Sequence, residues 1–214
     1  KLNTRRKDGY IESEEAIVTW CVGHLVAMVY PESYDIKYKK WKLEDLPFLP
    51  KEYKYDVIKD VSRQYDVVHG MLMREDIDRV YWAGDAGKEG QTIEENIRKF
   101  GGVREGMKEL RVWIDSQTEE EILRGIREAK DMSEYENLAK SGVMRTIEDY
   151  AMGINFSRAM SVKYGKLLND AAGTSSYTAI AVGRVMTCVL GMVVIREREI
   201  RNFKETPFYR VVGN

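Results

Sequence analysis

Residues 84–91 read Gly-Asp-Ala-Gly-Lys-Glu-Gly-Gln and contain the side chains best suited to chemistry. They follow a predicted strand and open a predicted helix, where an open parallel sheet places its ligands. Because N–H groups at a helix N-terminus attract anions, Asp85 and Glu89 lie where we expect a phosphate or a metal ion. Two carboxylates beside Lys88 suit Mg²⁺ held against a phosphodiester, since Mg²⁺ usually takes one or two carboxylates and keeps several waters.

The same segment has two other interpretations. It does not match the phosphate loop of nucleotide hydrolases, because that motif needs Ser or Thr after Gly-Lys and here Glu89 follows Lys88. A tight turn with a capping Asp and a solvated Glu also fits the residues. The segment alone leaves the metal site and the plain turn open.

The elements around this segment predict an α/β fold. Strands are expected at residues 16–21, 78–84 and 109–114, and helices at 58–74, from the Gly-rich turn to about 99, and at 117–129. Thr118 precedes three Glu residues, which favours the start of a helix. Alternating strands and helices predict a mostly parallel sheet with flanking helices.

A mainly helical region follows this sheet. Apolar residues recur on one helix face at Val143, Ile147, Tyr150, Ala151 and Ile154. A second helix is expected over 177–199, and an extended segment over 208–212. The predicted fold class is therefore α/β, a sheet with flanking helices followed by a mainly helical region.

Composition and charge narrow the classes of protein. Hydrophobic residues make up 43% of the 214 residues, enough for a core, which excludes wholesale disorder. The net charge of -1 excludes a uniformly basic surface. Residues 140–204 nevertheless carry ten basic and five acidic side chains, a net charge of +5. This asymmetry indicates two regions with different partners, or simply a solvated helix surface.

The sequence also predicts a compartment. No apolar run approaches the roughly 18–20 residues of a membrane span, so we expect a soluble protein. Cys21 and Cys188 stand far apart, a pattern that favours a reducing compartment over a disulfide scaffold. Neither Cys-x-x-Cys nor His-Glu-x-x-His occurs, so the sequence gives no indication of zinc.

The chain resembles the type IA DNA topoisomerases, of the topoisomerase III kind. Residues 85–91 resemble the D-x-D-R-E-G-E motif of Toprim domains. Seven further segments match in family order: residues 20–25 (WCVGHL), 41–47 (WKLEDLP), 112–118 (VWIDSQT), 145–150 (RTIEDY), 153–159 (GINFSRA), 182–187 (VGRVMT) and 196–203 (REREIRNF). The resemblance covers nearly the whole chain.

The resemblance implies an enzyme, a topoisomerase that cuts one DNA strand through a 5′-phosphotyrosyl link, passes a strand and religates. It implies Mg²⁺ as the cofactor, with Asp85 matching the first metal-binding Asp and Glu89 the Glu of the same motif. Glu89 would also assist proton transfer. Lys88 stands where the family has Arg, and it lacks the bidentate fork of that catalytic cation.

Some positions depart from the family pattern. Gly87 stands in place of the second Asp of the motif, and Gln91 in place of its final Glu, so less negative charge surrounds a metal. Ala181 and Met186 replace a Ser and a Gln that could bond DNA, and Cys188 replaces a Pro. A divergent branch with weak metal dependence and a degenerate branch both remain open.

By this resemblance the chain is an N-terminal fragment of a longer enzyme. Residues 1–131 are expected to form a Toprim-like domain without its first strand, which would carry an essential Glu. Residues 132–214 are expected to form the start of the helical DNA-gate base domain and to end where the next domain begins. The nucleophilic Tyr would lie outside this chain, so the fragment alone is expected to be inactive.

The candidates for DNA contact are Arg145, Arg158 and Arg184. Arg145 and Asp149 are four residues apart on one helix face, so a surface salt bridge is the alternative. If the helix is unbroken at Gly153, Arg158 falls near the apolar stripe as a buried Arg that needs an acidic partner. Gly183 permits close backbone approach beside Arg184.

Two further segments have open interpretations. Residues 37–42 alternate basic and aromatic side chains and could stack on a single strand, although Trp41 belongs to a segment that packs against its domain. His24 lies either near the active site or in the core as a satisfied histidine.

The expected partners are single-stranded DNA and the remaining domains of the same polypeptide, in a monomer without membrane contact. We expect a cytoplasmic, nucleoid-associated bacterial protein. The alternative function is a non-catalytic single-stranded DNA-binding module of the same fold. A Toprim nuclease or primase is disfavoured by the matches within residues 145–203.

Overall fold

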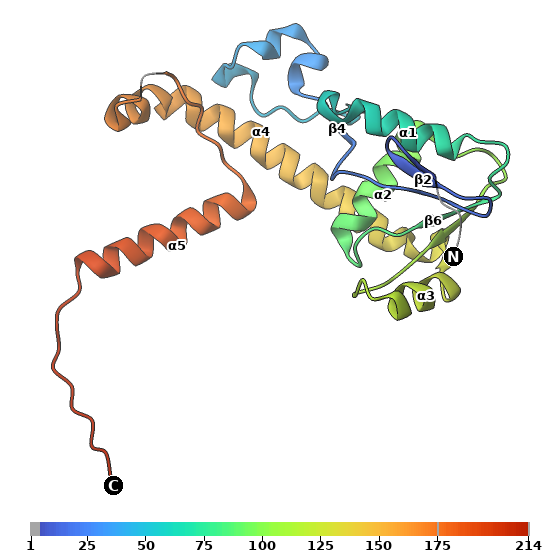
Figure 1. Cartoon of the computed structure of the whole chain (residues 1–214). Helices are drawn as coiled ribbons and strands as arrows, with labels where there is room; N and C mark the ends of the chain where they lie inside the picture. Colours follow the sequence, from blue (N-terminus) through green and yellow to red (C-terminus); the bar gives the residue numbers. More distant parts are fainter. Residues whose placement is uncertain (1–4, 175, 214) are drawn as a thin grey trace. The chain divides into compact units, whose positions relative to one another are not determined.

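The computed structural model describes residues 5–174 and 176–213. The chain divides into two compact units (Figure 1). The first contains the described residues up to Lys39 together with Leu49–Glu148, and the second contains Lys40–Phe48 and the described residues from Asp149 onward.

The strands are short and all those described lie in the first unit. They are β1 (Arg5–Lys7), β2 (Tyr10–Glu12), β3 (Ile17–Thr19), β4 (Val26–Met28), β5 (Tyr55–Val57), β6 (Arg79–Trp82), β7 (Lys108–Arg111) and β8 (Lys130–Asp131). The α-helices are α1 (Ser62–Leu72), α2 (Lys88–Gly101), α3 (Glu119–Arg127), α4 (Glu136–Ala172) and α5 (Arg184–Arg201). Short 3-10 turns are η1 (Pro31–Ser33), η2 (Ile36–Lys39), η3 (Leu43–Asp45), η4 (Lys59–Val61) and η5 (Met132–Tyr135).

The β6–α2–β7 unit positions the chemistry of the first unit. Strands β6 and β7 pair in parallel, with Val80 opposite Glu109 and Trp82 opposite Arg111. Parallel neighbours need a crossover connection, which α2 supplies. Strand β8 closes the edge antiparallel to β7. Residues 84–87 therefore leave the carboxyl end of β6 and enter the N-terminus of α2.

The strands before α1 pair differently. Strands β1, β2 and β3 form an antiparallel sheet, and β4 pairs antiparallel with β5. A two-residue connection can join only antiparallel strands, and Gly9 between β1 and β2 has the positive φ of 83° that such a tight turn uses. The predicted strand at 16–21 is therefore β3, outside the parallel pair.

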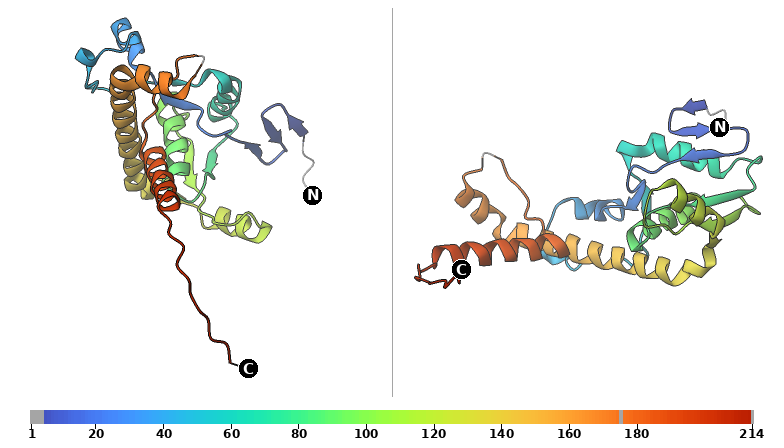
Figure 2. Two further views of the ribbon diagram at one scale, coloured as in Figure 1. Left: turned by 90° about the vertical axis from the view of Figure 1, so that its left-hand side faces the viewer. Right: turned by 60° about the horizontal axis from the view of Figure 1, so that its bottom comes forward.

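One apolar core holds the first unit together. Its buried members come mainly from β4, α1, β6 and α2, which lie together in Figures 1 and 2: Leu25, Val26, Tyr65, Val68, Leu72, Trp82, Ile97 and Met132. Helix α1 contributes Tyr65, Val68 and Leu72, at the three- and four-residue spacing of one helix face. Burial of these side chains fixes α1 and α2 against the strands.

The C-terminal part is helical. Helix α4 is unbroken from Glu136 to Ala172, so Gly153 does not interrupt it. Helix α5 begins at Arg184, later than the predicted start at 177, and after Phe203 the chain continues without regular structure (Figure 2).

Among the helices of residues 5–174 and 176–213, none combines the length and the hydropathy that a membrane span requires.

The predicted fold class is confirmed: an α/β unit with parallel strands beside residues 78–84 is followed by a mainly helical region. The predicted boundary after residue 131 falls just before α4, and as a statement about family domains it stays a prediction.

Candidate active site

The Asp85 loop, residues 84–87, lies between β6 and α2. Asp85 is exposed, and its backbone oxygen accepts a hydrogen bond from the Gly87 N–H at 2.8 Å. Gly87 is the N-cap of α2 and provides no side-chain cap, while Lys88 and Glu89 are exposed in the first turn. The positive end of the helix dipole and three ionisable side chains therefore meet at one end of α2.

Two glycines hold this loop close to α2. A Cβ at Gly90 would lie 2.3 Å from the backbone oxygen of Asp85 and 2.5 Å from its nitrogen, so a larger residue would displace the loop. A Cβ at Gly84 would lie 2.7 Å from Glu94 Oε1. Gly87 differs, because its φ of 174° is extended backbone and a Cβ at this position would meet nothing within 4 Å.

Glu89 is held by two cationic or polar partners from distant segments. Its Oε1 lies 2.8 Å from His24 Nε2, and its Oε2 lies 3.3 Å from Arg145 Nη2. The three side chains are partly exposed, so the arrangement is open to solvent. The structure thus places His24 at Glu89, and it brings Arg145 from α4 to the N-terminal turn of α2.

Close helix packing explains how Arg145 reaches Glu89. A Cβ at Gly142 would lie 2.1 Å from Thr92 Oγ1 and 3.3 Å from the Lys88 backbone oxygen, so α4 approaches α2 at a point where only glycine fits. The Thr92 hydroxyl donates to the Lys88 backbone oxygen at 2.6 Å. Arg145 follows Gly142 by three residues, so it lies on the same face of α4.

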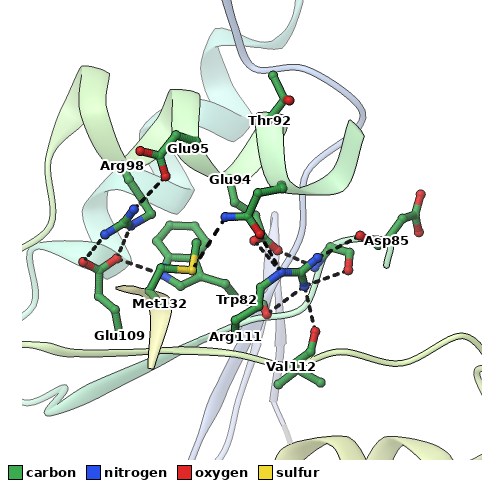
Figure 3. Close-up of polar contacts among 12 residues, drawn as sticks. Trp82, Asp85, Thr92, Glu94, Glu95, Arg98, Glu109, Arg111, Val112 and Met132 are labelled. Atoms are coloured by element: carbon green, nitrogen blue, oxygen red, sulfur yellow. Dashed lines mark hydrogen bonds and ion pairs between the residues drawn. The ribbon is translucent and has the colours of Figure 1, made fainter. Parts of the chain in front are cut away.

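A buried ion pair lies beneath the Asp85 loop. Arg111 at the end of β7 has no exposed surface, and its Nε lies 3.2 Å from Glu94 Oε2 of α2 (Figure 3). Glu94 Oε1 also accepts a hydrogen bond from the Gly84 N–H at 2.5 Å. Burial raises the pKa of Glu94 to about 7, although the Arg111 charge opposes that rise. Burial also lowers the pKa of Arg111.

A second ion-pair cluster ties α2 to β7 further along the helix. Arg98 donates to Glu109 at 2.5 and 2.8 Å and to Glu95 at 2.7 Å, and Trp82 Nε1 donates to Glu109 at 2.9 Å (Figure 3). These contacts support the crossover helix, and none of those described reaches the Asp85 loop.

Arg184 and its acidic partner belong to the second unit. Arg184 begins α5, where the helix dipole disfavours a cation. Its Nε lies 3.0 Å from Asp149 Oδ1 on α4, and that carboxylate offsets the unfavourable position. Both side chains are substantially exposed, so a phosphate could reach the guanidinium.

A ladder of side chains from α4 positions the segment before Arg184. The backbone N–H groups of Thr178, Ile180 and Val182 donate to Asn169, Ser161 and Ser157, each at 2.8 Å. Four helical residues rise about 6 Å, close to the rise of two extended residues, which accounts for the Ser157 and Ser161 contacts. The Asn169 contact lies outside this spacing. At Gly165 a Cβ would lie 2.4 Å from Tyr177 Oη, so glycine permits the segment to approach α4 closely.

Arg158 is buried, with 4% of its surface exposed. Its guanidinium carbon lies 5.3 Å from the centre of the Trp41 ring, a cation–π geometry. The unbroken α4 produces this burial, as the sequence suggested for a continuous helix. A DNA contact by Arg158 stays a prediction and would require the side chain to become exposed.

Comparisons with known proteins show similarity to DNA topoisomerases. A family model described as DNA topoisomerase matches residues 133–214. The chain is 38% identical over 207 residues to DNA topoisomerase 3 of Bacillus thuringiensis (strain Al Hakam) and of Bacillus anthracis, covering 97% of this chain and 26% of each relative. It is 36% identical to DNA topoisomerase 3 of Bacillus subtilis (strain 168), with the same coverage.

The chain belongs to the type IA DNA topoisomerases and, within that family, is similar to topoisomerase III. It spans about a quarter of the length of the relatives it matches. The residues matched by the family model include Arg145, Arg158 and Arg184.

Two carboxylates of this topoisomerase-family chain suit Mg²⁺. Asp85 and Glu89 offer exposed carboxylate oxygens near one helix N-terminus, and Mg²⁺ commonly binds one or two carboxylates together with substrate phosphates. A site made of protein ligands alone is not found: within residues 5–174 and 176–213, no group of three or more His, Cys, Asp or Glu could hold a metal ion.

Arg111 and Glu94 were not predicted from the sequence of this topoisomerase-family chain. Arg111 stands between Leu110 and Val112, and a charged residue within the otherwise apolar run 110–114 was the available signal. Glu94 gave no comparable signal, because a Glu in a helix is usually solvated.

Proposed function

We propose that the complete protein containing this chain is a Mg²⁺-dependent type IA topoisomerase. It cuts one DNA strand through a 5′-phosphotyrosyl link, passes a second strand and religates the break. The observation that carries this proposal is the convergence of the Asp85 loop, Glu89 and Arg145 at the N-terminus of α2. The tyrosine nucleophile is assigned to another part of the complete polypeptide.

In this proposal the acidic residues act on the metal and on a proton. Asp85 and Glu89 would hold Mg²⁺, which supplies positive charge at the scissile phosphate when bound. Glu89 also exchanges a proton with the tyrosine or the leaving ribose oxygen, and His24 orients that carboxylate through the 2.8 Å contact. Lys88, at the start of α2, neutralises the phosphate as a point charge.

The arginines contribute to DNA binding. Arg145 and Arg184 are each at least partly exposed and each paired with a carboxylate, so a DNA phosphate would replace Glu89 or Asp149 as the partner. Such contacts position a single strand without reading its bases. We propose that residues 1–131 act as the Toprim-like part and that the helical region contributes to the DNA gate, within a monomer.

The test is relaxation of negatively supercoiled plasmid by the complete gene product. We expect relaxation with Mg²⁺, none with EDTA, and denaturant-trapped protein on the 5′ ends of cut strands. Tight binding of single-stranded DNA with no relaxation at any Mg²⁺ concentration would instead establish the non-catalytic binding module.

A further inference from the structure

Arg111 is a buried cation that contacts several segments of the first unit. Its side chain has no exposed surface. A buried guanidinium is costly unless its charge is paired and its N–H groups are all bonded. Here Glu94 Oε2 lies 3.2 Å from Nε, and Gln91 Oε1 accepts a hydrogen bond from Nε at 3.1 Å.

The two Nη groups of Arg111 bond to the backbone around the Asp85 loop. Nη1 donates to the carbonyl oxygens of Trp82 at 3.2 Å and Gly84 at 2.9 Å, and Nη2 donates to that of Asp85 at 2.8 Å. Nη1 also donates to Val112, the residue that follows Arg111. One planar group therefore binds the end of β6, the loop and α2 together.

The backbone and the side chain of Asp85 face different directions. Its backbone oxygen faces Arg111, while its carboxylate is directed away from the guanidinium (Figure 3). Gly90 permits the loop to lie close to α2, because a Cβ added there would lie only 2.3 Å from the Asp85 backbone oxygen. Arg111 thus holds the loop at a place where Gly90 lets it approach the helix.

We propose that Arg111 is a positioning residue, which holds the backbone of residues 82–85 so that the Asp85 carboxylate stays at the N-terminal end of α2, the end that also carries Glu89. The inference rests on the proposed function of that site. Arg111 touches neither metal nor DNA in this proposal, and it acts through hydrogen bonds to carbonyl oxygens. Contacts of this outer kind commonly change metal affinity by about 10–100-fold.

A plain structural ion pair with Glu94 is the competing explanation. Arg111→Lys separates the two, because an ammonium can still face Glu94 but lacks the fork that reaches the carbonyl oxygens of Trp82, Gly84 and Asp85 together. Arg98→Lys is the matched control, since Arg98 also links α2 to β7 through carboxylates and the contacts described for it do not reach the loop.

The experiment uses the complete gene product and three measurements. Hydrogen exchange reports the loop through a peptide covering residues 83–91, Mn²⁺ titration reports the metal site, and plasmid relaxation is followed across a Mg²⁺ titration. For Arg111→Lys we expect about tenfold faster exchange in the loop peptide, about tenfold weaker Mn²⁺ binding and a matching rise in the Mg²⁺ midpoint. Binding of single-stranded DNA should be unchanged, and excess Mg²⁺ should restore the relaxation rate.

Unchanged loop exchange and Mn²⁺ affinity in Arg111→Lys would overturn the proposal, as would equal effects in Arg98→Lys. If Arg111→Lys does not fold, Gly90→Ala displaces the same loop and leaves the ion pair intact, so it should weaken Mn²⁺ binding in the same way; normal Mn²⁺ binding there contradicts the proposal. If the wild-type protein relaxes no DNA, the proposed function fails, while exchange and Mn²⁺ binding still decide the role of Arg111.

Discussion

Arg145 Nη2 lies 3.3 Å from Glu89 Oε2, so a candidate phosphate ligand and a candidate metal ligand are paired with each other. Both side chains are partly exposed, and such pairs contribute only about 0–1 kcal/mol to stability. Replacing Glu89 by a DNA phosphate as the partner of Arg145 therefore costs little free energy. The Glu89 carboxylate then becomes available to a metal ion.

Arg145→Ala should weaken binding of single-stranded oligonucleotides about equally for all sequences. Each lost phosphate contact flattens the log–log dependence of affinity on salt by roughly 0.7, because fewer counterions are released. Arg124→Ala is the control, since Arg124 pairs with carboxylates of α3 and the adjoining Glu128. A lower melting temperature with an unchanged salt slope would assign Arg145 to stability alone.

The ladder from α4 to residues 178–182 should be needed to present Arg184. Replacing Ser157 and Ser161 together by Ala removes two of the hydroxyl acceptors, so amides of that segment should exchange faster and DNA affinity should fall at low salt. Ser141→Ala, in the part of α4 that belongs to the first unit, is the control. Normal exchange in the double variant would show that the hydroxyls do not hold the segment.

Gly87→Asp should strengthen Mg²⁺ binding. The position has extended backbone and open space, so the added carboxylate fits without strain. A further negative charge about 4 Å from a cation adds at least ~1 kcal/mol even in water, roughly fivefold in affinity. Gly87→Asn has the same shape without the charge, and calorimetry with Mg²⁺ or Mn²⁺ compares the two. Equal affinities would place the metal away from Gly87.

Glu94 should make stability fall as pH rises through neutrality. Burial raises its pKa to about 7 in the folded protein, above the ordinary value of 4.5, so the folded state binds the proton more tightly. The stability from this group is complete below about pH 4.5 and is lost as pH rises through about 7. Relative to Glu94→Gln, the wild-type protein should lose up to about 3 kcal/mol between about pH 4.5 and 8.

Chemical denaturation of both proteins at several pH values measures this difference. Glu121→Gln is a control in which stability depends on pH in the opposite direction. Arg124 lowers the pKa of Glu121, so any stability from that carboxylate is lost as pH falls. Parallel curves for the wild-type protein and Glu94→Gln would show that Arg111 keeps Glu94 ionised throughout.

Local patterns predicted the β6–loop–α2 segment well, because an apolar run, glycines and a polar helix are all contiguous in the sequence. The start of the last helix was predicted too early. Side chains of α4 accept hydrogen bonds from the backbone N–H groups of residues 178–182 and keep that segment extended, and helix propensity alone does not predict such contacts. Arg111 escaped prediction for a related reason: its acceptors other than Val112 lie 20 to 29 positions earlier in the chain and meet only in the folded sheet.

The roles of the site residues stay predictions, since geometry alone gives Asp85, Lys88 and Glu89 their places and not their chemistry. The same holds for DNA contact by Arg145, Arg158 and Arg184. Of these six residues, Arg158 would require the largest rearrangement, because it is buried against Trp41.

The most direct measurement is plasmid relaxation by Asp85→Asn in the complete gene product, across a Mg²⁺ titration, with binding of single-stranded DNA measured in parallel. The substitution removes one metal-binding charge and keeps the shape of the side chain. We predict relaxation slower by about 100-fold or more at every Mg²⁺ concentration, since a catalytic metal contributes several kcal/mol, with DNA binding nearly intact. Relaxation at the wild-type rate across the titration would contradict the account.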